Sequence, residues 1–300
     1  MDLNRQERPL RQEDGSGVDT YQRRVNQHFT DATPYWGDVY ERQDLDGVVY
    51  REREERVLGW IDSLGSRPGS TVLEVGCGAG RLTLALTRRR YRVRAIDSVQ
   101  SMVETARRRL QQEGAPAAVD IGDAHALSAA DGSATLVVAV GVIPWLAEPS
   151  EAVSEMARVA AAGGHVIVSA DNRARLTYLL DPRFHPFALP IKRALKKVIR
   201  WLGFWSDRPE NYAHTHYTYE LDKLVARAGL VKMSSQTVGF GPFTLLGRPV
   251  LSEAATISLH RRLQRLADCR VPFLRVMGSN YLVLAKKVQS SSVAGAPSSK

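Results

Sequence analysis

Three glycines at alternate positions directly follow an apolar run in the stretch VLEVGCGAGRL, residues 72–82. The preceding TVLEV is β-rich and apolar except for Glu74, which is typical of a strand buried on both faces of a parallel sheet. The following RLTLALTRR returns to helical periodicity. Glycine adopts backbone angles that other residues resist and lets a ligand approach the main chain closely. The stretch predicts a strand, a turn and a helix, and the turn either binds a ligand or is only a tight connection.

The segments that follow repeat this alternation. YRVRAID reads as a second strand that ends at Asp97, and Gly122, Asp123 and Ala124 close a third. ATLVVAVGVIPWL and GGHVIVSADN read as a fourth and a fifth strand. An acidic side chain at the end of the second strand can accept hydrogen bonds from ribose hydroxyls, which suits a NAD enzyme as well. The alternative for Asp97 and Asp123 is a solvated loop carboxylate.

The succession of motifs resembles the class I S-adenosylmethionine-dependent methyltransferases over residues 72–287. The pattern E-x-G-x-G-x-G and the carboxylate after the third strand carry this resemblance and separate it from the NAD enzymes. It implies an α/β, Rossmann-like methyltransferase fold with a seven-stranded mixed sheet, helices on both faces and SNYLVLAKK as the last strand. It also implies S-adenosylmethionine as the cofactor. The residues that it assigns to the cofactor are Glu74, Gly76, Gly78 and Gly80, then Asp97, Ser98 and Val99, then Asp123, Ala124 and Val140.

The segment before the first strand is rich in aromatic residues and arginines. In related methyltransferases such a segment covers the cofactor, and one of its arginines binds the methionine carboxylate. We expect Arg56 to be this arginine, with Arg51 as the next choice. Tyr35 and Trp36 either line the acceptor pocket or pack the helix on the sheet.

About forty residues separate the fifth strand from the next expected helix, TYELDKLVARAGL. Within them, PIKRALKKVIRWLGFW at 190–205 is amphipathic when wound at about 100° per residue. An interfacial membrane helix has this basic face and these tryptophans, although a surface helix or an acceptor lid that packs on the core is the alternative. The basic face consists of Lys192, Arg193, Lys196, Lys197 and Arg200.

The insertion extends the resemblance to the O-methyltransferase group of ubiquinone biosynthesis, in which an amphipathic segment follows the corresponding strand. That group has an E-x-x-E-H signature, associated with a divalent metal, which would fall on Gly141, Pro144 and Trp145 here. None of these side chains binds a metal or accepts a proton, so we expect no metal site. The resemblance implies a small, lipophilic acceptor, and we expect methylation on oxygen.

An acceptor hydroxyl needs a group that orients it or removes its proton. The candidates just after the insertion are His214, His216 and Tyr217, and His28 is a further candidate near the amino terminus. The alternative for each histidine is an ordinary surface residue without a catalytic role. A tailoring enzyme for a soluble metabolite and a binding protein without catalysis remain alternatives to the lipid reading.

Composition sets the outer limits of the prediction. Residues 1–20 and 289–300 are polar and are predicted to be disordered tails, 21–66 a helical cap, and 67–288 the methyltransferase domain with an insertion at 173–212. The formal charge of +9 lacks an accompanying nucleic-acid motif, so we expect an anionic membrane surface rather than nucleic acid as the partner of 190–205. Two cysteines and the lack of an apolar run of spanning length predict a cytoplasmic protein that can dock on the inner membrane face.

Overall fold

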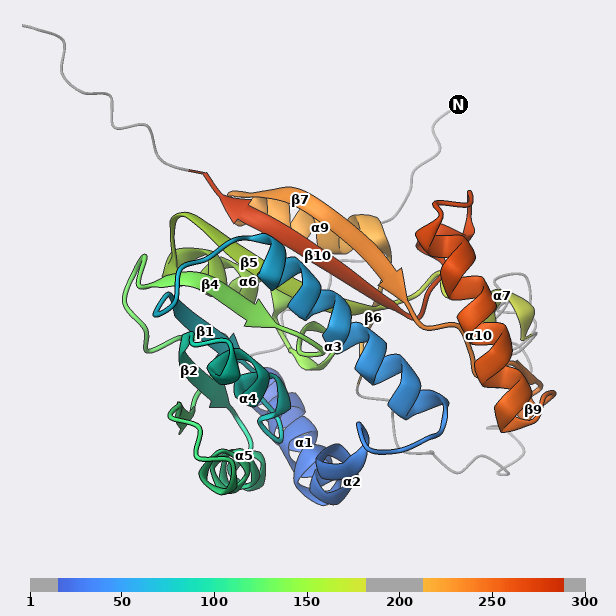
Figure 1. Ribbon diagram of the computed structural model, residues 1–300, viewed down its shortest axis with the longest axis horizontal. Helices are drawn as coiled ribbons and strands as arrows, with labels where there is room; N and C mark the ends of the chain where they lie inside the picture. The colour runs from blue at the N-terminus through green and yellow to red at the C-terminus, as the bar shows by residue number, and fades with distance from the viewer. Residues whose placement is uncertain (1–15, 182–212, 289–300) are drawn as a thin grey trace, which may run out of the picture.

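The computed structural model describes residues 16–181 and 213–288, and a twisted central sheet organises them (Figure 1). A separate two-stranded hairpin follows the seventh strand. The strands are β1 (Thr71–Val75), β2 (Arg92–Asp97), β3 (Ala118–Ile121), β4 (Ala134–Ala139), β5 (Ala160–Asn172), β6 (Thr215–His216), β7 (Leu230–Val238), β8 (Thr244–Leu245), β9 (Arg248–Pro249) and β10 (Asn280–Lys287).

The sheet has the order β3-β2-β1-β4-β5-β10-β7, and the short β6 pairs with the end of β5. All neighbouring pairs are parallel except those of β10, which is antiparallel to both β5 and β7. The predicted seven-stranded mixed sheet with SNYLVLAKK as its last strand is confirmed. The third strand ends at Ile121, so Gly122, Asp123 and Ala124 form the loop beyond it rather than its last residues.

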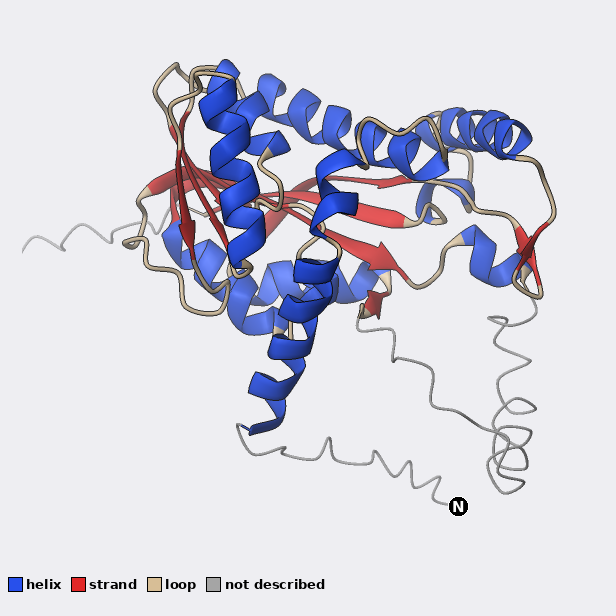
Figure 2. Ribbon diagram, turned by 90° about the horizontal axis from the view of Figure 1, so that it is seen from below, coloured by secondary structure: helices blue, strands red, loops and turns tan. Residues whose placement is uncertain are grey.

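Helices cover both faces of the sheet (Figure 2). Near the front of Figure 1, α3, α4 and α5 lie over one face, whereas α6 and α9 lie behind the sheet. The helices are α1 (Ser16–Asp31), α2 (Thr33–Asp38), α3 (Leu45–Ser63), α4 (Arg81–Arg88), α5 (Gln100–Gln112), α6 (Pro149–Val159), α7 (Leu176–Leu180), α9 (Thr218–Arg227) and α10 (Glu253–Asp268), with 3-10 turns η1 (Ile143–Trp145) and η3 (Leu274–Val276).

The apolar core lies in two layers because successive side chains of a strand point to opposite faces. In β4, Val137 packs into the layer that contains Met156 of α6. Its neighbour Leu136 packs into the opposite layer with Val57 and Ile61 of α3. Burial of each such side chain contributes on the order of 1.5 to 3 kcal/mol. The sheet is therefore a rigid support for the loops at its edge.

The start of α3 is fixed by its own sequence. The Asp44 side chain accepts a hydrogen bond from the Gly47 backbone N–H at 3.0 Å, as an N-cap residue does. A Cβ at Gly47 would lie 2.2 Å from the Arg42 carbonyl oxygen, so only glycine fits there. These two residues hold the helix that carries Tyr50 and Arg53 in place.

The helical region before β1 agrees with the predicted cap, but α1 already begins at Ser16, within the range predicted as a disordered tail. Asn26 of this helix is hydrogen-bonded to Ser98 in the loop after β2. Residues 1–15 and 289–300 and the amphipathic segment at 190–205 lie outside the described residues. No described helix is long and apolar enough to cross a bilayer.

Candidate active site

The glycine turn follows β1 at the carboxyl edge of the sheet, and all three glycines have positive φ, at 69°, 51° and 77°. A Cβ at Gly76 would lie 2.4 Å from Val142 Cγ2, and one at Gly80 would lie 2.7 Å from Ala106 Cβ. A Cβ at Gly78 would meet nothing within 4 Å. Gly76 and Gly80 therefore permit close packing, whereas Gly78 leaves its backbone open to a ligand.

Asp97 ends β2 and fastens the glycine turn. Its carboxylate accepts hydrogen bonds from the backbone N–H of Gly78 at 2.8 Å and of Val99 at 3.0 Å. Burial raises the pKa of Asp97, and these backbone hydrogen bonds oppose the increase. Because a carboxylate has about four lone-pair sites, two backbone donors leave acceptor capacity for a ligand.

Glu74 lies beneath the turn and is 4% exposed. The Thr83 hydroxyl donates a hydrogen bond of 2.6 Å to its carboxyl group. Burial, with a further contribution from Asp97 and Glu54, raises the pKa of Glu74 to about 8. This carboxyl group is therefore protonated at neutral pH.

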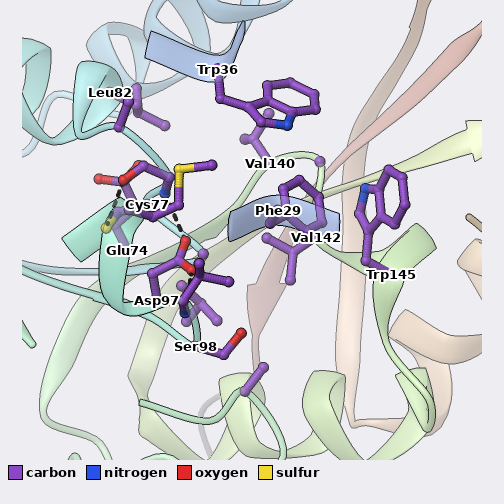
Figure 3. A pocket seen from close by; sticks show the side chains of 18 of the residues that line it. Phe29, Trp36, Glu74, Cys77, Leu82, Asp97, Ser98, Val140, Val142 and Trp145 are labelled. Carbon is purple, nitrogen blue, oxygen red and sulfur yellow. Dashed lines mark hydrogen bonds between the residues drawn. The ribbon is translucent and has the colours of Figure 1, made fainter. Parts of the chain in front are cut away.

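A pocket opens over the turn, and aromatic rings form the side that faces away from Glu74, Cys77 and Asp97 (Figure 3). Phe29 of α1 lies 4.8 Å from Trp145 and 5.7 Å from Trp36, measured between ring centroids. Trp36 in turn lies 5.5 Å from Tyr50. The pocket thus has a polar, glycine-rich floor and an aromatic wall.

The first two helices are held over the pocket by contacts with the loop after β2 and with the first turn of α5. Asn26 donates a hydrogen bond to the Ser98 carbonyl and accepts one from the Ser98 hydroxyl at 3.0 Å. The hydroxyls of Thr33 and Ser101 lie 2.8 Å apart. These contacts hold α1 and α2 beside the pocket, with Phe29 and Trp36 in its wall.

Of the arginines in α3, Arg53 lines the pocket and Arg56 does not. Arg53 is 6% exposed, lines the pocket and donates a hydrogen bond of 3.2 Å to Asn280. Arg56 instead bonds Gln236 at 2.9 Å and Asp268 at 2.7 Å, outside the pocket lining. Arg56 does not reach the pocket, because the side of α3 that carries it turns toward β7 and α10.

Most of the residues assigned to the cofactor meet at this pocket. Apart from Arg56, the exception is Gly80, which forms the N-cap of α4 against Ala106. Asp123 lies at the pocket with 61% of its side chain exposed and binds His125 at 2.7 Å. The assigned residues that line the pocket are Glu74, Gly76, Gly78, Asp97, Ser98, Val99, Asp123, Ala124 and Val140.

None of the four candidate catalytic residues lines the pocket in the described part of the chain. His28 stacks on the outside of the wall, 5.4 Å from Trp145, and His214 stacks on Tyr21 at 5.3 Å. Tyr217 precedes α9 and stacks on Tyr219. His216 is half-buried in β6, and burial lowers its pKa. Direct contact of these side chains with an acceptor is therefore not favoured by the geometry.

Three buried polar atoms of the pocket residues have no hydrogen-bond partner within residues 16–181 and 213–288: Gln22 Oε1, Trp36 Nε1 and Arg53 Nε. Buried polar groups of this kind are usually satisfied by a ligand or water. The N–H donors of Trp36 and Arg53, the Asp97 carboxylate and the open backbone at Gly78 fit a ligand with both carboxylate and hydroxyl groups. S-adenosylmethionine has both. No cluster of three or more metal-ligating side chains occurs in residues 16–181 and 213–288.

Among the pocket residues that were not predicted, Arg53 and Asp171 have a signal in the sequence. Arg53 stands four residues before Val57 and eight before Ile61, so helical spacing places it on the buried face of α3. Asp171 lies near the carboxyl end of β5, at the same sheet edge as the glycine turn, where open α/β sheets bind ligands.

A family model described as "Methyltransferase domain" matches residues 73–168. The ubiquinone biosynthesis O-methyltransferase of Pseudomonas paraeruginosa is 31% identical over 158 residues, which make up 50% of this chain and 67% of that enzyme. The chain belongs to the class I S-adenosylmethionine-dependent methyltransferases. S-adenosylmethionine is the cofactor that this family uses.

Other relatives of this methyltransferase differ in what their names say they act on. The phosphatidylethanolamine N-methyltransferase of Cereibacter sphaeroides is 34% identical over 124 residues, covering 41% of this chain and 59% of that enzyme. The ubiquinone biosynthesis O-methyltransferase of Cupriavidus pinatubonensis is 32% identical over 124 residues, covering 41% of this chain and 50% of that enzyme. The chain thus spans about half the length of these two relatives.

Among solved structures, the magnesium protoporphyrin IX methyltransferase of Synechocystis PCC 6803 with bound SAH aligns with a TM-score of 0.60 at 17% identity. The alignment covers 89% of this chain and 99% of that one. At this identity the likeness establishes a shared fold and confirms the predicted Rossmann-like architecture.

Proposed function

We propose that the protein transfers a methyl group from S-adenosylmethionine to an oxygen atom of a small, lipophilic acceptor. The observation that carries this proposal is the aromatic wall of Phe29, Trp36, Tyr50 and Trp145 directly beside the glycine-rich floor. Such a wall favours an apolar, planar molecule, since aromatic rings stack on one another. The bound cofactor would supply an activated methyl group on sulfur.

The residues of the floor would hold the cofactor by its polar groups. Asp97 would accept hydrogen bonds from the ribose hydroxyls, and Asp123 would accept one from the adenine amino group. Arg53 would bind the methionine carboxylate, for which its unpartnered Nε and its buried position are suited. Gly78 would let the backbone approach the ligand closely.

Orientation would be the main catalytic contribution of the chain. Holding two reactants in line can supply roughly 7 to 11 kcal/mol of the barrier. Leu82, Val140 and Val142 add apolar surface to the pocket and help to exclude water. Gly141, Pro144 and Trp145 offer no metal ligands, which supports a reaction without a divalent ion.

We further propose that the reaction takes place at the cytoplasmic face of a membrane, with residues 190–205 docked on anionic lipid. The basic residues and tryptophans of that segment support this proposal, as do relatives named for ubiquinone biosynthesis and phosphatidylethanolamine methylation. Each basic residue near an anionic leaflet contributes on the order of 1 kcal/mol.

Cofactor turnover tests the proposed activity. The purified protein is incubated with methyl-labelled S-adenosylmethionine and with either a lipid extract or an aqueous extract of cells. We expect label in the lipid fraction together with release of S-adenosylhomocysteine. Label only among water-soluble products would favour a tailoring enzyme, and an absence of turnover with both extracts would favour a binding protein.

Vesicle sedimentation tests the membrane proposal. Binding should increase with the anionic lipid content and decrease with salt, and Lys196→Glu with Lys197→Glu should release the protein without lowering its melting temperature. If 190–205 is a lid, Leu202→Glu should instead destabilise the fold while the charge reversal leaves partitioning unchanged. A wild type that ignores anionic vesicles at low salt would contradict membrane docking.

A further inference from the structure

Asp171 brings a further carboxylate to the pocket, on the side of β5. It pairs in register with Asn280 of β10, and Arg53 donates its hydrogen bond to that asparagine rather than to Asp171. A third of the Asp171 side chain is exposed, and the residue lines the pocket together with the aromatic wall. The carboxylate is thus accessible from the pocket interior.

The hydrogen-bonding state of Asp171 differs from that of Glu74 and Asp97. Glu74 accepts a hydrogen bond from Thr83, and Asp97 accepts two from the backbone. Within residues 16–181 and 213–288, no donor makes a hydrogen bond to the Asp171 carboxylate, and Arg175 is the cation in ion-pair range, at 3.7 Å. Asp171 therefore keeps its acceptor capacity for a ligand.

We propose that Asp171 binds the hydroxyl group of the acceptor and takes its proton, so that the acceptor is a planar aromatic molecule bearing a hydroxyl. This inference rests on the proposed methyl-transfer function. The aromatic wall holds the ring, and the carboxylate fixes the direction in which the oxygen points. Because a carboxylate repels anions, acceptors that present a carboxylate or phosphate to Asp171 are disfavoured.

The reaction balances with Asp171 as the proton acceptor. A lone pair of the acceptor oxygen forms the new O–CH3 bond while the bond between the methyl carbon and sulfur breaks, and its electron pair stays on sulfur. The hydroxyl proton passes to the Asp171 carboxylate, which releases it to water after the product leaves. The products are the methyl ether and S-adenosylhomocysteine.

Titratable and charged groups from α3, from the loop after β5 and from β6 surround this carboxylate. Tyr50 and Arg53 face it from α3, Arg175 from the loop after β5, and His216 from β6. Burial raises the pKa of Asp171, and Arg175, Arg53 and His216 limit the increase. Since only the ionised form accepts a proton, the rate should decrease as the pH falls through this raised pKa.

A binding experiment with 2-naphthol and naphthalene tests the recognition step. Affinities are measured by quenching of tryptophan fluorescence, with S-adenosylhomocysteine present. We expect the wild type to prefer 2-naphthol by roughly 10- to 100-fold, as for a hydrogen bond to a charged group. Asp171→Ala should abolish this preference. The control Arg175→Met, which removes the ion-pair partner together with its contacts to the Asn172 carbonyl and the Tyr178 ring, should retain it.

Equal binding of the two compounds, or no binding of either, would overturn the proposed acceptor class. Loss of the preference in Arg175→Met as well would show that the ion pair, rather than acceptor recognition, is the role of Asp171. Thermal melts of each variant establish that the protein is folded during the titration.

Methyl transfer to 2-naphthol tests the proton transfer. With saturating cofactor, Asp171→Asn should lower kcat by about 10²- to 10⁴-fold and remove the acid limb of the pH profile. Retained kcat with an unchanged acid limb would overturn the assignment of Asp171 while the methyltransferase function stands. If the protein prefers 2-naphthol to naphthalene but transfers no methyl group to 2-naphthol or to the lipid extract, the proposed methyltransferase function is contradicted. The role of Asp171 in binding a hydroxyl group would then remain supported.

Discussion

Replacing Glu74 by glutamine should make the stability of the apo protein less dependent on pH. The folded chain holds the Glu74 proton up to a pKa of about 8, whereas the unfolded chain loses it near 4.5. Between these values the folded state binds more protons, so the free energy of unfolding decreases as the pH rises. Glutamine is nearly isosteric, does not titrate and can still accept the hydrogen bond from Thr83.

The magnitude follows from the part of this interval that lies between pH 6 and pH 8. Each pH unit in this range lowers the free energy of unfolding of the wild type by about 1.4 kcal/mol. From pH 6 to pH 8 the wild type therefore loses roughly 3 kcal/mol of stability that Glu74→Gln retains. For a domain of this size, about 2 to 4 °C of melting temperature corresponds to each kcal/mol. The melting temperatures of the two proteins should therefore diverge by roughly 6 to 12 °C over this range.

Thermal melts of both proteins at pH 6, 7, 8 and 9 measure this difference. All other titrating groups are shared, so the difference between the two curves isolates Glu74. The curves should separate up to about pH 8 and then run parallel, because the pKa of Glu74 in the folded chain is about 8. Curves that stay parallel from pH 6 to pH 9 would refute the assignment of a protonated Glu74.

Three further predictions concern the cofactor and metals. Asp97→Ala should weaken S-adenosylmethionine binding by about 1.5 to 3 kcal/mol in a calorimetric titration, the range for hydrogen bonds to charged groups, and unchanged affinity in the folded variant would remove Asp97 from the site. Arg53→Met should lower the same affinity by roughly tenfold or more, whereas Arg56→Met, whose partners lie outside the pocket, should leave it unchanged; equal effects would contradict the choice between them. Methyl transfer should persist after treatment with a chelator, and a loss that magnesium restores would reveal a metal site.

The sequence predicted the parts of the fold in which local and global signals agree. TVLEV, the glycine turn and Asp97 lie where expected because a buried parallel strand needs a continuous apolar run and a tight turn with positive φ needs glycine. The same agreement identified β10 as the last strand. The contacts that hold α1 and α2 were not predicted, since those of Asn26 with the loop after β2 and of Thr33 with Ser101 of α5 are long-range.

The acceptor side of the pocket was less predictable. Arg53 and Arg56 are both plausible from composition, and only the packing of α3 between the sheet and α10 decides which one is buried. The candidate histidines were chosen as groups that could orient an acceptor hydroxyl or remove its proton, but His28 stacks on Trp145 and His214 on Tyr21. Asp171 was overlooked although it lies near the carboxyl end of β5, at the sheet edge where open α/β sheets bind ligands.

A crystal structure of the protein with S-adenosylhomocysteine would test the central claim most directly. We expect the ribose hydroxyls within hydrogen-bonding distance of Asp97 and the adenine beside Asp123 and Ala124. The amino-acid carboxylate should lie at Arg53, and the sulfur should face the aromatic wall. A ligand that lies outside this pocket, or one whose ribose does not contact Asp97, would contradict it.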